Sequence, residues 1–375
     1  MKKSWLRRYT KYTLVSVNII IALTFLIGCL LPWLSSKYFG ILGFIGFAMP
    51  YLFLALFFSI LFWLFVKRKI ALYFFIVLCC GYKQASVIFA FNTNTTFKKN
   101  KANYNIRLVS WNIGNMSGRP QNNNLKRHSI DEIVSSLLKQ NADVICLQEF
   151  EECRSGCKSL DLIRKKYPYY CFPGWIIGPY RHGSGSAIFS KYPIIKTDST
   201  RFENGENIIT ADVAINDDTL SFFTTHLDSY KFSKDEFREI DAVAKDETIP
   251  KKNYRGIISK LNNTLITHSE QTDVVIDFFS TTKHPIVFCA DLNEVANNNN
   301  YWRIRGDKQD AFLKKGWGFG KTFNSLSPIL RIDYIMPDNN FEVTQFDIVE
   351  EGLSDHSLLV TDLMLKKYQS EKTKQ

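Results

Sequence analysis

Six short apolar runs in this chain of 375 residues each finish on polar residues that can bind a metal ion or move a proton. The runs lie at residues 106–112, 143–149, 220–226, 285–293, 331–334 and 353–356. The polar residues at or near their ends are Asn112, Glu149, His226, Asp291, Asn293, Asp333, Asp355 and His356. Buried strands read as apolar runs, and a sheet protein presents side chains to ligands at strand ends. A single apolar run that finishes on a polar residue does not indicate a site, whereas six such runs predict that their polar residues form one site.

Glu149, Asp291 and Asp355 are carboxylates at the ends of such runs. A hard cation such as Mg²⁺ binds a few carboxylates, with waters and substrate phosphate oxygens as further ligands. Each carboxylate alone is more often a solvated charge or a helix cap, but their repeated placement favours a metal site. The amides of Asn112 and Asn293 can orient a carboxylate or donate to a phosphate oxygen without adding negative charge.

His226 and His356 can move protons near neutral pH. A histidine with an acidic partner is a better general acid or base. Asp333 is a candidate for such a partner. The sequence suggests no acidic partner for His226. The glycine-rich residues 183–186 match neither a nucleophile elbow nor a phosphate-binding loop. We therefore predict direct attack by a water that is oriented by a metal or activated by a base.

Strand-like and helix-like segments alternate from residue 104 onward. Strands are predicted at residues 106–111, 144–147, 186–190, 208–214, 220–225, 286–290, 331–336 and 358–365. Helices are predicted at residues 129–139 and 256–279, where apolar residues fall mostly on one face. We expect a hairpin turn at residues 216–218 and only a short polar turn at residues 297–300. The pattern predicts mixed sheets with helices outside.

The charged residues 229–254 form a different kind of segment, because they show little periodicity and directly follow His226. Such a loop would cover or select the substrate, and an ordinary solvated insertion is an equally good interpretation.

Three long apolar stretches precede the globular part, at residues 12–35, 41–66 and 70–91. A bilayer core of about 30 Å needs about 20 apolar residues in a helix, so the first two stretches qualify as membrane spans. Lys83 and Gln84 interrupt the third, and a lysine near a helix centre costs roughly 2.5–3.5 kcal/mol. We predict a third span in which Lys83 contacts a neighbouring helix or snorkels. Residues 1–92 then form a membrane domain, 93–103 a linker and 368–375 a polar tail.

Basic residues predict the orientation in the membrane, because cytoplasmic segments are enriched in lysine and arginine. Two clusters flank the spans: Lys2, Lys3, Arg7, Arg8 and Lys11, and then Lys67, Arg68 and Lys69. Three spans place the globular domain outside the cytoplasm, and two would place it inside, which Lys98, Lys99 and Lys101 mildly favour. We predict an integral protein of the cell membrane with a non-cytoplasmic globular domain. The formal net charge of +11 suits a polyanion or an anionic membrane surface.

The positions of the cysteines predict their chemical state. Cys146 and Cys289 lie in strand-like runs and are expected to be packed thiols. Cys153, Cys157 and Cys171 lie in loop-like sequence without a fourth zinc ligand at suitable spacing, so one disulfide is expected if the domain is exported.

The ordered motifs resemble those of the endonuclease/exonuclease/phosphatase superfamily, which includes pancreatic deoxyribonuclease, apurinic endonucleases, neutral sphingomyelinases and inositol polyphosphate phosphatases. The motifs are Trp111-Asn112, Leu147-Gln148-Glu149, Thr225-His226-Leu227, Asp291-Leu292-Asn293, Arg331-Ile332-Asp333-Tyr334 and Ser354-Asp355-His356. The resemblance covers residues 104–367. It implies a four-layered α/β sandwich of two packed mixed sheets flanked by helices, and metal-dependent cleavage of a phosphoester.

The resemblance also implies a role for each residue. Glu149 would be the main Mg²⁺ ligand, with Asn112 beside it and Asp355 contributing. Asp291 would orient or deprotonate the attacking water, and Asn293 would hold the scissile phosphate. His356, paired with Asp333, would contact the phosphate and serve in proton transfer or charge stabilisation. His226 resembles the second histidine of the deoxyribonuclease and sphingomyelinase branches, where apurinic endonucleases carry a tyrosine.

These observations predict a membrane-anchored phosphoesterase that depends on Mg²⁺, or on Mn²⁺, and acts on nucleic acid or a phospholipid headgroup. The alternative is a non-catalytic, membrane-tethered module that binds a phosphate ligand. A transporter is disfavoured, because three spans with one interior lysine offer little pathway. No obligate protein partner is evident.

Overall fold

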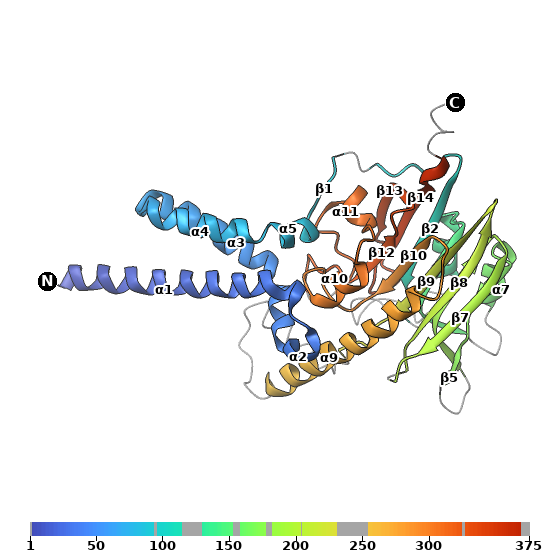
Figure 1. The fold of residues 1–375 in the computed structure, drawn as a ribbon, viewed down its shortest axis with the longest axis horizontal. Helices are drawn as coiled ribbons and strands as arrows, with labels where there is room; N and C mark the ends of the chain where they lie inside the picture. Colours follow the sequence, from blue (N-terminus) through green and yellow to red (C-terminus); the bar gives the residue numbers. More distant parts are fainter. Residues whose placement is uncertain are drawn as a thin grey trace.

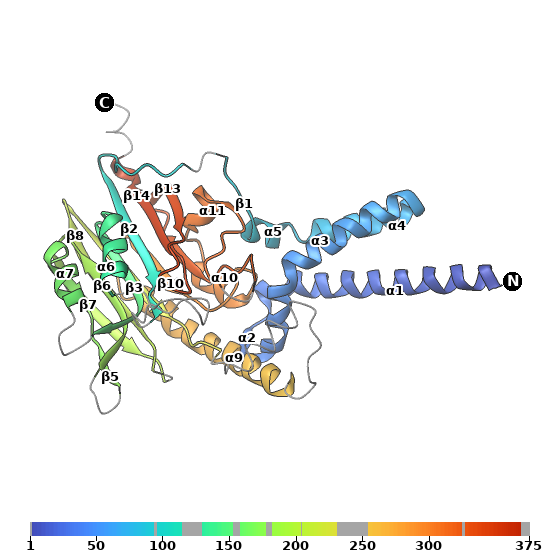
Figure 2. The ribbon, with the colours of Figure 1, turned by 180° about the vertical axis from the view of Figure 1, so that it is seen from behind.

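Two β-sheets pack face to face in the C-terminal part of the chain, and helices cover their outer faces (Figures 1 and 2). The arrangement comes from a computed structural model of the whole chain. It describes residues 2–93, 96–114, 130–152, 158–177, 182–203, 205–230, 254–324 and 327–368. The layers run helix, sheet, sheet, helix, which confirms the predicted four-layered α/β sandwich.

The first sheet is mixed and has five strands in the order β12, β10, β9, β8, β7. β9 and β10 are parallel, and the other neighbouring pairs are antiparallel. The strands are β7 Ile194–Arg201, β8 Asn207–Ile215, β9 Asp218–His226, β10 Ile286–Asp291 and β12 Asp333–Pro337. Asn216 has a φ of 54° between β8 and β9, so the predicted hairpin turn is confirmed.

The second sheet is also mixed and has seven strands. Six follow the order β13, β14, β2, β3, β6, β4, and β5 pairs with β6. β2 and β3 are parallel. The strands are β2 Asn105–Asn112, β3 Val144–Glu152, β4 Tyr169–Cys171, β5 Trp175–Ile177, β6 His182–Ser190, β13 Phe341–Val349 and β14 Leu358–Leu365. A two-stranded sheet joins β1 Ala90–Phe91 to β11 Trp317–Gly318.

The central strands are buried on both faces. In β10, Val287 and Cys289 pack between the two sheets, whereas Phe288 and Ala290 pack under the outer helices. Successive side chains of a strand point to opposite faces, so a strand covered on both sides is apolar throughout. The first polar residue after such a run therefore marks the place where the strand leaves the core.

The outer helices have one apolar face each. α6 Ile130–Lys139 and α7 Lys158–Lys166 cover the second sheet, and α9 Tyr254–Phe279 and α10 Asn299–Arg305 cover the first. The helices predicted at residues 129–139 and 256–279 are thus confirmed. The short α11 Ala311–Lys315 packs beside β13, and the turn η4 Lys366–Tyr368 follows β14.

Two helices are long and apolar enough to cross a membrane, namely α1 Lys2–Leu30 and α3 Gly43–Val66. With the short elements that adjoin them, their candidate spans are Arg8–Trp33 and Ser36–Val66, in agreement with the stretches predicted at 12–35 and 41–66. The connection contains η1 Leu31–Trp33, α2 Ser36–Phe39 and η2 Gly40–Leu42. The N-terminus and the turn after α3 lie at the end of the helices farthest from the sandwich (Figure 1).

The third apolar stretch is bent. α4 Arg68–Cys80 and α5 Tyr82–Ile88 meet at Gly81 with an angle of 59°, as in a broken span or a re-entrant loop, so the third span predicted at 70–91 stays a prediction. A Cβ atom at Gly81 would lie 2.3 Å from the Phe25 ring, so only glycine lets the bend approach α1 this closely. α5 turns onto the sandwich, where the Val87 carbonyl accepts a hydrogen bond from Arg331 at 2.8 Å.

Lys83 of α5 contacts aromatic rings from both parts of the molecule. Its Nζ lies 4.1 Å from the ring centre of Trp33 and 4.4 Å from that of Trp302 in α10. The predicted contact of Lys83 with a neighbouring helix is therefore confirmed, and a cation over aromatic faces is a favourable arrangement.

The asparagine-rich residues 297–300 attach the sandwich to the N-terminal apolar helices, which is more than the simple turn that we expected. Asn297 Nδ2 donates to the Gly46 carbonyl at 3.2 Å, and Asn299 Nδ2 donates to the Pro32 carbonyl at 2.8 Å. A Cβ atom at Gly46 would lie 2.1 Å from Asn298 Oδ1, so glycine is needed for this close approach.

The remaining predictions concern cysteines and loops. Cys146 and Cys289 are fully buried thiols, as expected. Among the described residues Cys171 has a free thiol, whereas Cys153 and Cys157 lie outside the described ranges. Most of the charged segment 229–254 and the tail after residue 368 also lie outside them.

Candidate active site

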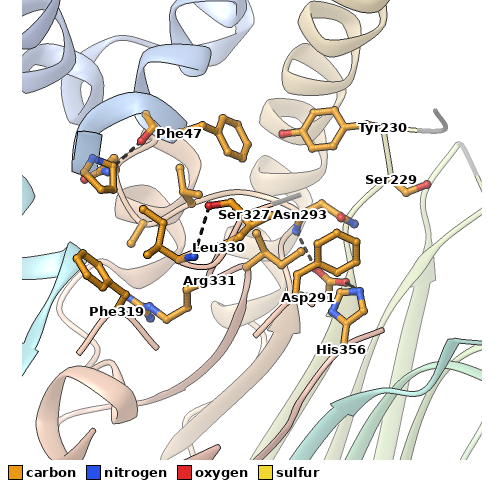
Figure 3. Close-up of a pocket in the computed structure, with 18 of the residues that line it drawn as sticks. Phe47, Ser229, Tyr230, Asp291, Asn293, Phe319, Ser327, Leu330, Arg331 and His356 are labelled. Carbon is orange, nitrogen blue, oxygen red and sulfur yellow. Dashed lines mark hydrogen bonds and ion pairs between the residues drawn. The ribbon is translucent and has the colours of Figure 1, made fainter. Parts of the chain in front are cut away.

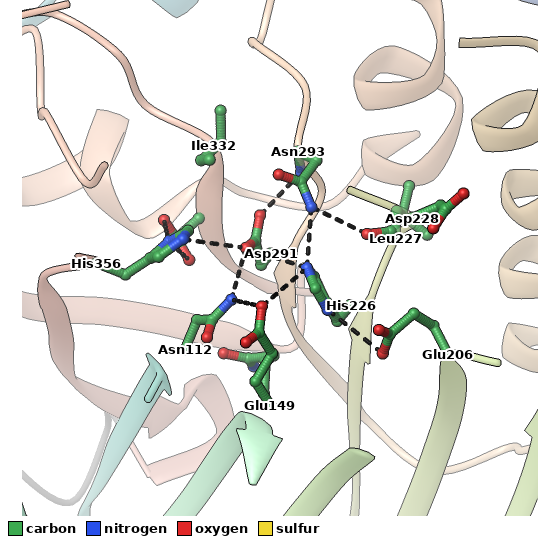
Figure 4. A network of polar contacts seen from close by, with 12 residues as sticks. Asn112, Glu149, Glu206, His226, Leu227, Asp228, Asp291, Asn293, Ile332 and His356 are labelled. Atoms are coloured by element: carbon green, nitrogen blue, oxygen red, sulfur yellow. Dashed lines mark hydrogen bonds and ion pairs between the residues drawn. The ribbon is translucent and has the colours of Figure 1, made fainter. Parts of the chain in front are cut away.

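Strand register brings the predicted residues to one end of the sandwich (Figure 4). In the first sheet Asp291 pairs with His226 of β9 on one side and with Asp333 of β12 on the other. In the second sheet Asn112 pairs with Gln148, the neighbour of Glu149. Asn112 Nδ2 then donates to Asp291 Oδ2 at 2.9 Å across the gap between the sheets. The site therefore requires both sheets.

The Asp291 carboxylate is fully buried at the centre of the site. Its Oδ1 accepts a hydrogen bond from the Asn293 backbone N–H at 2.8 Å. Its Oδ2 lies 3.6 Å from the Nε2 atoms of both His226 and His356. Burial raises the pKa of Asp291, and Asp333 adds to the rise, while the two histidines lower it. Asp291 is therefore a stronger base than an exposed aspartate when it is ionised.

His356 is held by Asp333, so the structure brings the predicted pair together. His356 Nδ1 lies 3.0 Å and 3.2 Å from the two carboxylate oxygens of Asp333. This contact fixes a proton on Nδ1 and turns Nε2 toward Asp291. Burial alone would lower the pKa of His356, but Asp333, Asp291 and Asp355 outweigh burial and raise it to about 10.

His226 receives a hydrogen bond from Asn293. The two hydrogens of Asn293 Nδ2 point to the Leu227 carbonyl and to His226 Nε2, each at 2.9 Å. In the neutral ring this contact makes Nε2 the acceptor and leaves the proton on Nδ1, whereas in the protonated ring Nε2 carries a proton of its own. Burial lowers the pKa of His226, but Glu206, Asp291 and Glu149 outweigh burial and raise it well above its ordinary value. An acceptor nitrogen with a high proton affinity suits a group that takes up a proton and passes it on.

Glu206 is the acidic partner of His226 that the sequence did not reveal. Its Oε2 lies 3.3 Å from His226 Nδ1, an ion-pair distance, and its side chain is largely buried. Glu206 stands just before β8, and the antiparallel register between β8 and β9 places the start of one strand beside the end of the other. A pattern of polar residues at the ends of strands therefore does not indicate Glu206.

Glu149 has an unusual backbone conformation. Its φ is 49°, and the register between β3 and β6 shifts between Leu147 and Phe150. Asn293 has the same φ of 49°. Such angles cost roughly 1–3 kcal/mol in a residue other than glycine and tend to occur at functional sites. Bulges also re-aim side chains near active sites, and here the bulge directs the Glu149 carboxylate toward Asn112 and His226.

The donor set fits a divalent cation. Glu149 and Asp355 line the same pocket as Asp291, and the Glu149 side chain is 26% exposed, so its oxygens are accessible. Carboxylate oxygens are the ligands that Mg²⁺ and Mn²⁺ prefer. Asp291, Asp333 and His356 also offer atoms within 4.8 Å of one another, but both Asp333 oxygens already contact His356. Asp291, Asp333 and His356 form a candidate ion-binding group, and the role of Glu149 and Asp355 as metal ligands stays a prediction.

Asn112 links two carboxylates. Its Nδ2 donates to Asp291 and, at 3.3 Å, to Glu149 Oε1, while its Oδ1 accepts from the Gly114 N–H at 3.0 Å. The amide nitrogen thus faces the carboxylates. A direct role for Asn112 as a metal ligand stays a prediction, because Oδ1 would have to leave Gly114.

The site opens into a pocket of about 770 Å³ that continues away from the polar residues (Figure 3). Asp291, Asn293 and His356 lie at one end. Residues of the N-terminal apolar helices line the other end, among them Phe47 of α3, whose ring centre lies 6.3 Å from that of Tyr230. One pocket therefore joins a polar end to an apolar end.

Comparison with known protein families shows which family this chain belongs to. A profile described as the endonuclease/exonuclease/phosphatase family matches residues 109–356, which contain all eight predicted site residues. This protein belongs to the endonuclease/exonuclease/phosphatase family. A second profile, described as a domain of unknown function (DUF8431), matches residues 11–88. No curated protein matches the chain.

Solved structures of similar fold include an endonuclease/exonuclease/phosphatase from Beutenbergia cavernae, with 16% identity and a TM-score of 0.49 over 70% of this chain and 72% of the other. The human Nocturnin catalytic domain with bound sulfate is 17% identical, with a TM-score of 0.48 over 70% and 94% of the two chains. Zebrafish (D. rerio) TDP2 complexed with single-strand DNA product is 15% identical, with a TM-score of 0.44 over 69% and 98%.

The structure of this family member brings all eight predicted residues together and adds residues that sequence reasoning missed. Besides Glu206, these are the residues of α3 and α5 that line the pocket, including Phe47, Pro50 and Val87. In the sequence their apolar character predicts only a membrane span. Contact of these residues with the candidate active site cannot be recognised from the sequence, because it requires no further residue type.

Proposed function

We propose that this protein is a membrane-anchored hydrolase that uses Mg²⁺ or Mn²⁺ to cleave a phosphoester by attack of water. One observation carries the proposal. Strand ends from two sheets place a buried carboxylate, Asp291, within 3.6 Å of two histidines, with an accessible glutamate nearby. The family membership supports the same reaction class.

In this mechanism Asp291 orients the attacking water and accepts one of its protons, since burial raises the pKa of this carboxylate. Asn293 and His356 contact the phosphoryl oxygens, and Asp333 keeps His356 in the required orientation. A divalent ion held by Glu149 and Asp355 would stabilise negative charge on the phosphoryl group. Asn112 keeps Glu149 and Asp291 in place.

His226 completes the proton balance. The water oxygen bonds to phosphorus and the bond to the leaving oxygen breaks. One water hydrogen stays on the new phosphate hydroxyl, and the leaving oxygen gains a proton from His226 while Asp291 takes up the other water hydrogen. Glu206 favours the protonated form of His226 and so supports this role.

The orientation of the membrane helices supports a sandwich on the non-cytoplasmic side. Lys11 and the other early basic residues precede the part of α1 that approaches the sandwich, and Lys67 lies in the turn after α3. Both clusters are therefore far from the sandwich. The positive-inside rule then places the sandwich outside the cytoplasm.

A turnover assay with the full chain in phospholipid nanodiscs tests the reaction. Substrates are a nitrophenyl phosphodiester, DNA, RNA and phospholipids, each assayed with Mg²⁺, with Mn²⁺ and with chelator. We expect turnover of at least one, loss of it in chelator and recovery when metal is restored. Asp291→Asn and His356→Gln should each reduce kcat by at least about 10³-fold.

The exposed residues Asp131 and His284 supply matched controls, and Asp131→Asn and His284→Gln should leave kcat unchanged. Activity that persists in chelator, or in both active-site variants, would contradict the mechanism. Binding of a phosphoester without any turnover by the folded wild type would instead support the non-catalytic binding module.

A further inference from the structure

We propose that the substrate is a membrane lipid phosphoester whose hydrocarbon chain lies along the apolar end of the active-site pocket. This inference rests on the proposed function and names its substrate class. The apolar end is lined by Phe44, Phe47 and Pro50 of α3, Ile257 and Leu261 of α9, and Leu330. These six residues are called the apolar wall below.

The first reason is the chemical division of the pocket. Its catalytic end holds Asp291, Asn293 and His356, which can contact a phosphoester. Its other end holds the apolar wall. A substrate that is polar along its whole length would lose its bound water there without gaining hydrogen bonds. Pockets that bind small molecules combine an apolar lining with a few polar groups that fix orientation. A molecule with a phosphate at one end and a hydrocarbon chain at the other matches both parts.

The second reason is that the described residues of the pocket offer no available cation for a polyanion. Among the described residues that line the pocket, the only lysine or arginine is Arg331. Its Nη1 donates to Asp310 at 2.7 Å and its Nη2 to the Val87 carbonyl at 2.8 Å. Nucleic-acid sites use many lysine and arginine contacts to phosphates. The described pocket therefore suits a single phosphate group better than a nucleic-acid backbone.

The third reason is the height of the apolar wall relative to the bilayer. α3 has 24 residues and ends at Val66, next to the basic residues 67–69. A hydrocarbon core of about 30 Å takes up about 20 helical residues. Counting that length back from Val66 reaches Phe47, which is in the apolar wall. Phe47 of the apolar wall therefore lies at the level where lipid chains begin.

Aromatic residues around the junction support this placement. Tyr51 lies one turn beyond Phe47, and its hydroxyl contacts Ser327 Oγ of the sandwich at 3.0 Å. Trp33, Tyr38 and Trp317 are exposed: Trp33 contacts Lys83 of α5, Tyr38 belongs to α2, which packs on α9, and Trp317 pairs with Phe91. Tryptophan and tyrosine are enriched at the boundary between membrane and water. A lipid could thus enter the pocket sideways with its chain still in the bilayer.

The test uses three phosphodiesters that release p-nitrophenolate and differ only in their alkyl chain, which is ethyl, octyl or hexadecyl. The full chain is assayed in phosphatidylcholine nanodiscs with Mg²⁺, and kcat/KM is measured for each substrate. The wall variants are Phe47→Ala in α3 and Leu261→Asn in α9. The matched controls are Phe58→Ala and Ile258→Asn, because Phe58 and Ile258 are exposed residues of the same two helices.

We expect kcat/KM to rise with chain length in the wild type. Each wall variant should lower kcat/KM for the hexadecyl ester by about tenfold and change that for the ethyl ester by less than about twofold. The control variants should keep the wild-type ratio. Long chains partition into every nanodisc equally, so only the difference between wall and control variants reports on the pocket.

Other outcomes separate the two proposals. If Asp291→Asn abolishes turnover but wall and control variants keep the same chain-length dependence, the lipid inference fails and the proposed function stands. A kcat/KM for a single-stranded oligonucleotide above that for the hexadecyl ester would also overturn the inference alone. If the folded wild type cleaves none of the phosphoesters, both proposals fail.

Discussion

Asp291 is the residue on which the rest of the site depends. It is buried, yet it accepts hydrogen bonds from Asn112 and from the Asn293 backbone, and two histidines stand nearby. A buried carboxylate without such neighbours would remain protonated and would be a poor base. The polar groups around Asp291 keep a basic carboxylate available within an otherwise apolar structure.

Replacement of Glu206 tests its role as the partner of His226. Glu206 raises the pKa of His226, so Glu206→Gln should lower that pKa and make the ring a weaker proton carrier. We expect kcat to fall by about 10- to 100-fold. The alkaline limb of the profile of kcat against pH should also move to lower pH.

Glu203 offers a control, because it is an exposed glutamate in the same connection between β7 and β8. Glu203→Gln should leave both kcat and the pH profile unchanged. An unaltered alkaline limb in Glu206→Gln would show that Glu206 has no influence on the group that titrates there.

The pairing of His356 with Asp333 predicts a pH dependence of stability. The folded protein raises the pKa of His356 from 6.5 to about 10, so the folded state holds a proton that the unfolded state loses first. The contribution of this proton to the free energy of unfolding is complete below about pH 6.5 and is lost as the pH rises toward 10. We expect the Tm of the metal-free protein to fall over this window.

Asp333→Asn should lower the pKa of His356 and flatten this part of the pH dependence. NMR titration of the His356 ring would follow the pKa directly. A Tm profile in Asp333→Asn with the wild-type slope would contradict the assignment, since other titrating groups are the same in both proteins.

At this scale the sequence predicts the candidate site well, because its polar side chains follow buried strands. His226, Asp291 and Asp333 are neighbours in register, so three separate run ends form one row. Glu206 was not predicted because it precedes a strand, and only the antiparallel pairing of β8 with β9 brings it to the site. Such pairing cannot be read from a single run.

At the scale of elements, Arg331 connects three parts of the fold. Its guanidinium donates to Asp310, which caps α11, and to the carbonyl of Val87 in α5. Both charged side chains are buried. An ion pair in this position is costly to break, because removal of one partner leaves the other charge buried.

Arg331→Met should therefore lower the free energy of unfolding by about 3–5 kcal/mol. Chemical denaturation of the full chain in detergent measures this change. Arg164→Met provides the control, because Arg164 is exposed on α7, and it should shift stability by less than about 0.5 kcal/mol. Equal stability of the two variants would show that the Arg331 contacts contribute little.

Some elements were not predicted because they are only partly buried. β13 alternates buried and half-buried residues, and β7 is largely exposed, so neither reads as an apolar run. α5 was merged with α4, since hydropathy does not reveal a bend of 59°. The packing of Gly81 against Phe25 explains that bend, and such a contact depends on the folded structure.

At the scale of the molecule, the N-terminal apolar helices and the sandwich share contacts on several elements. α2 packs on α9, Asn297 and Asn299 donate hydrogen bonds to helix carbonyls, and β1 pairs with β11. The sequence-based boundary at residue 92 therefore separates two compositions, whereas the folded structure places residues 82–92 against the sandwich.

Cysteine labelling in intact cells tests the proposed orientation. Lys37 lies at the sandwich end of the helices and Lys67 at the opposite end, and both are exposed. A membrane-impermeant maleimide should label Lys37→Cys in intact cells and label Lys67→Cys only after permeabilisation, beyond the wild-type background. The reverse pattern would place the sandwich in the cytoplasm.

The pocket that joins Asp291 to Phe47 has a consequence for the direction of the reaction. Cleavage of a lipid held there would leave the polar fragment free to dissolve in water and the hydrocarbon fragment in its leaflet. The two products would then be diluted in different phases, so their recombination would become rare. The rate would follow the mole fraction of substrate in the leaflet, and a cell could control it by changing membrane composition alone.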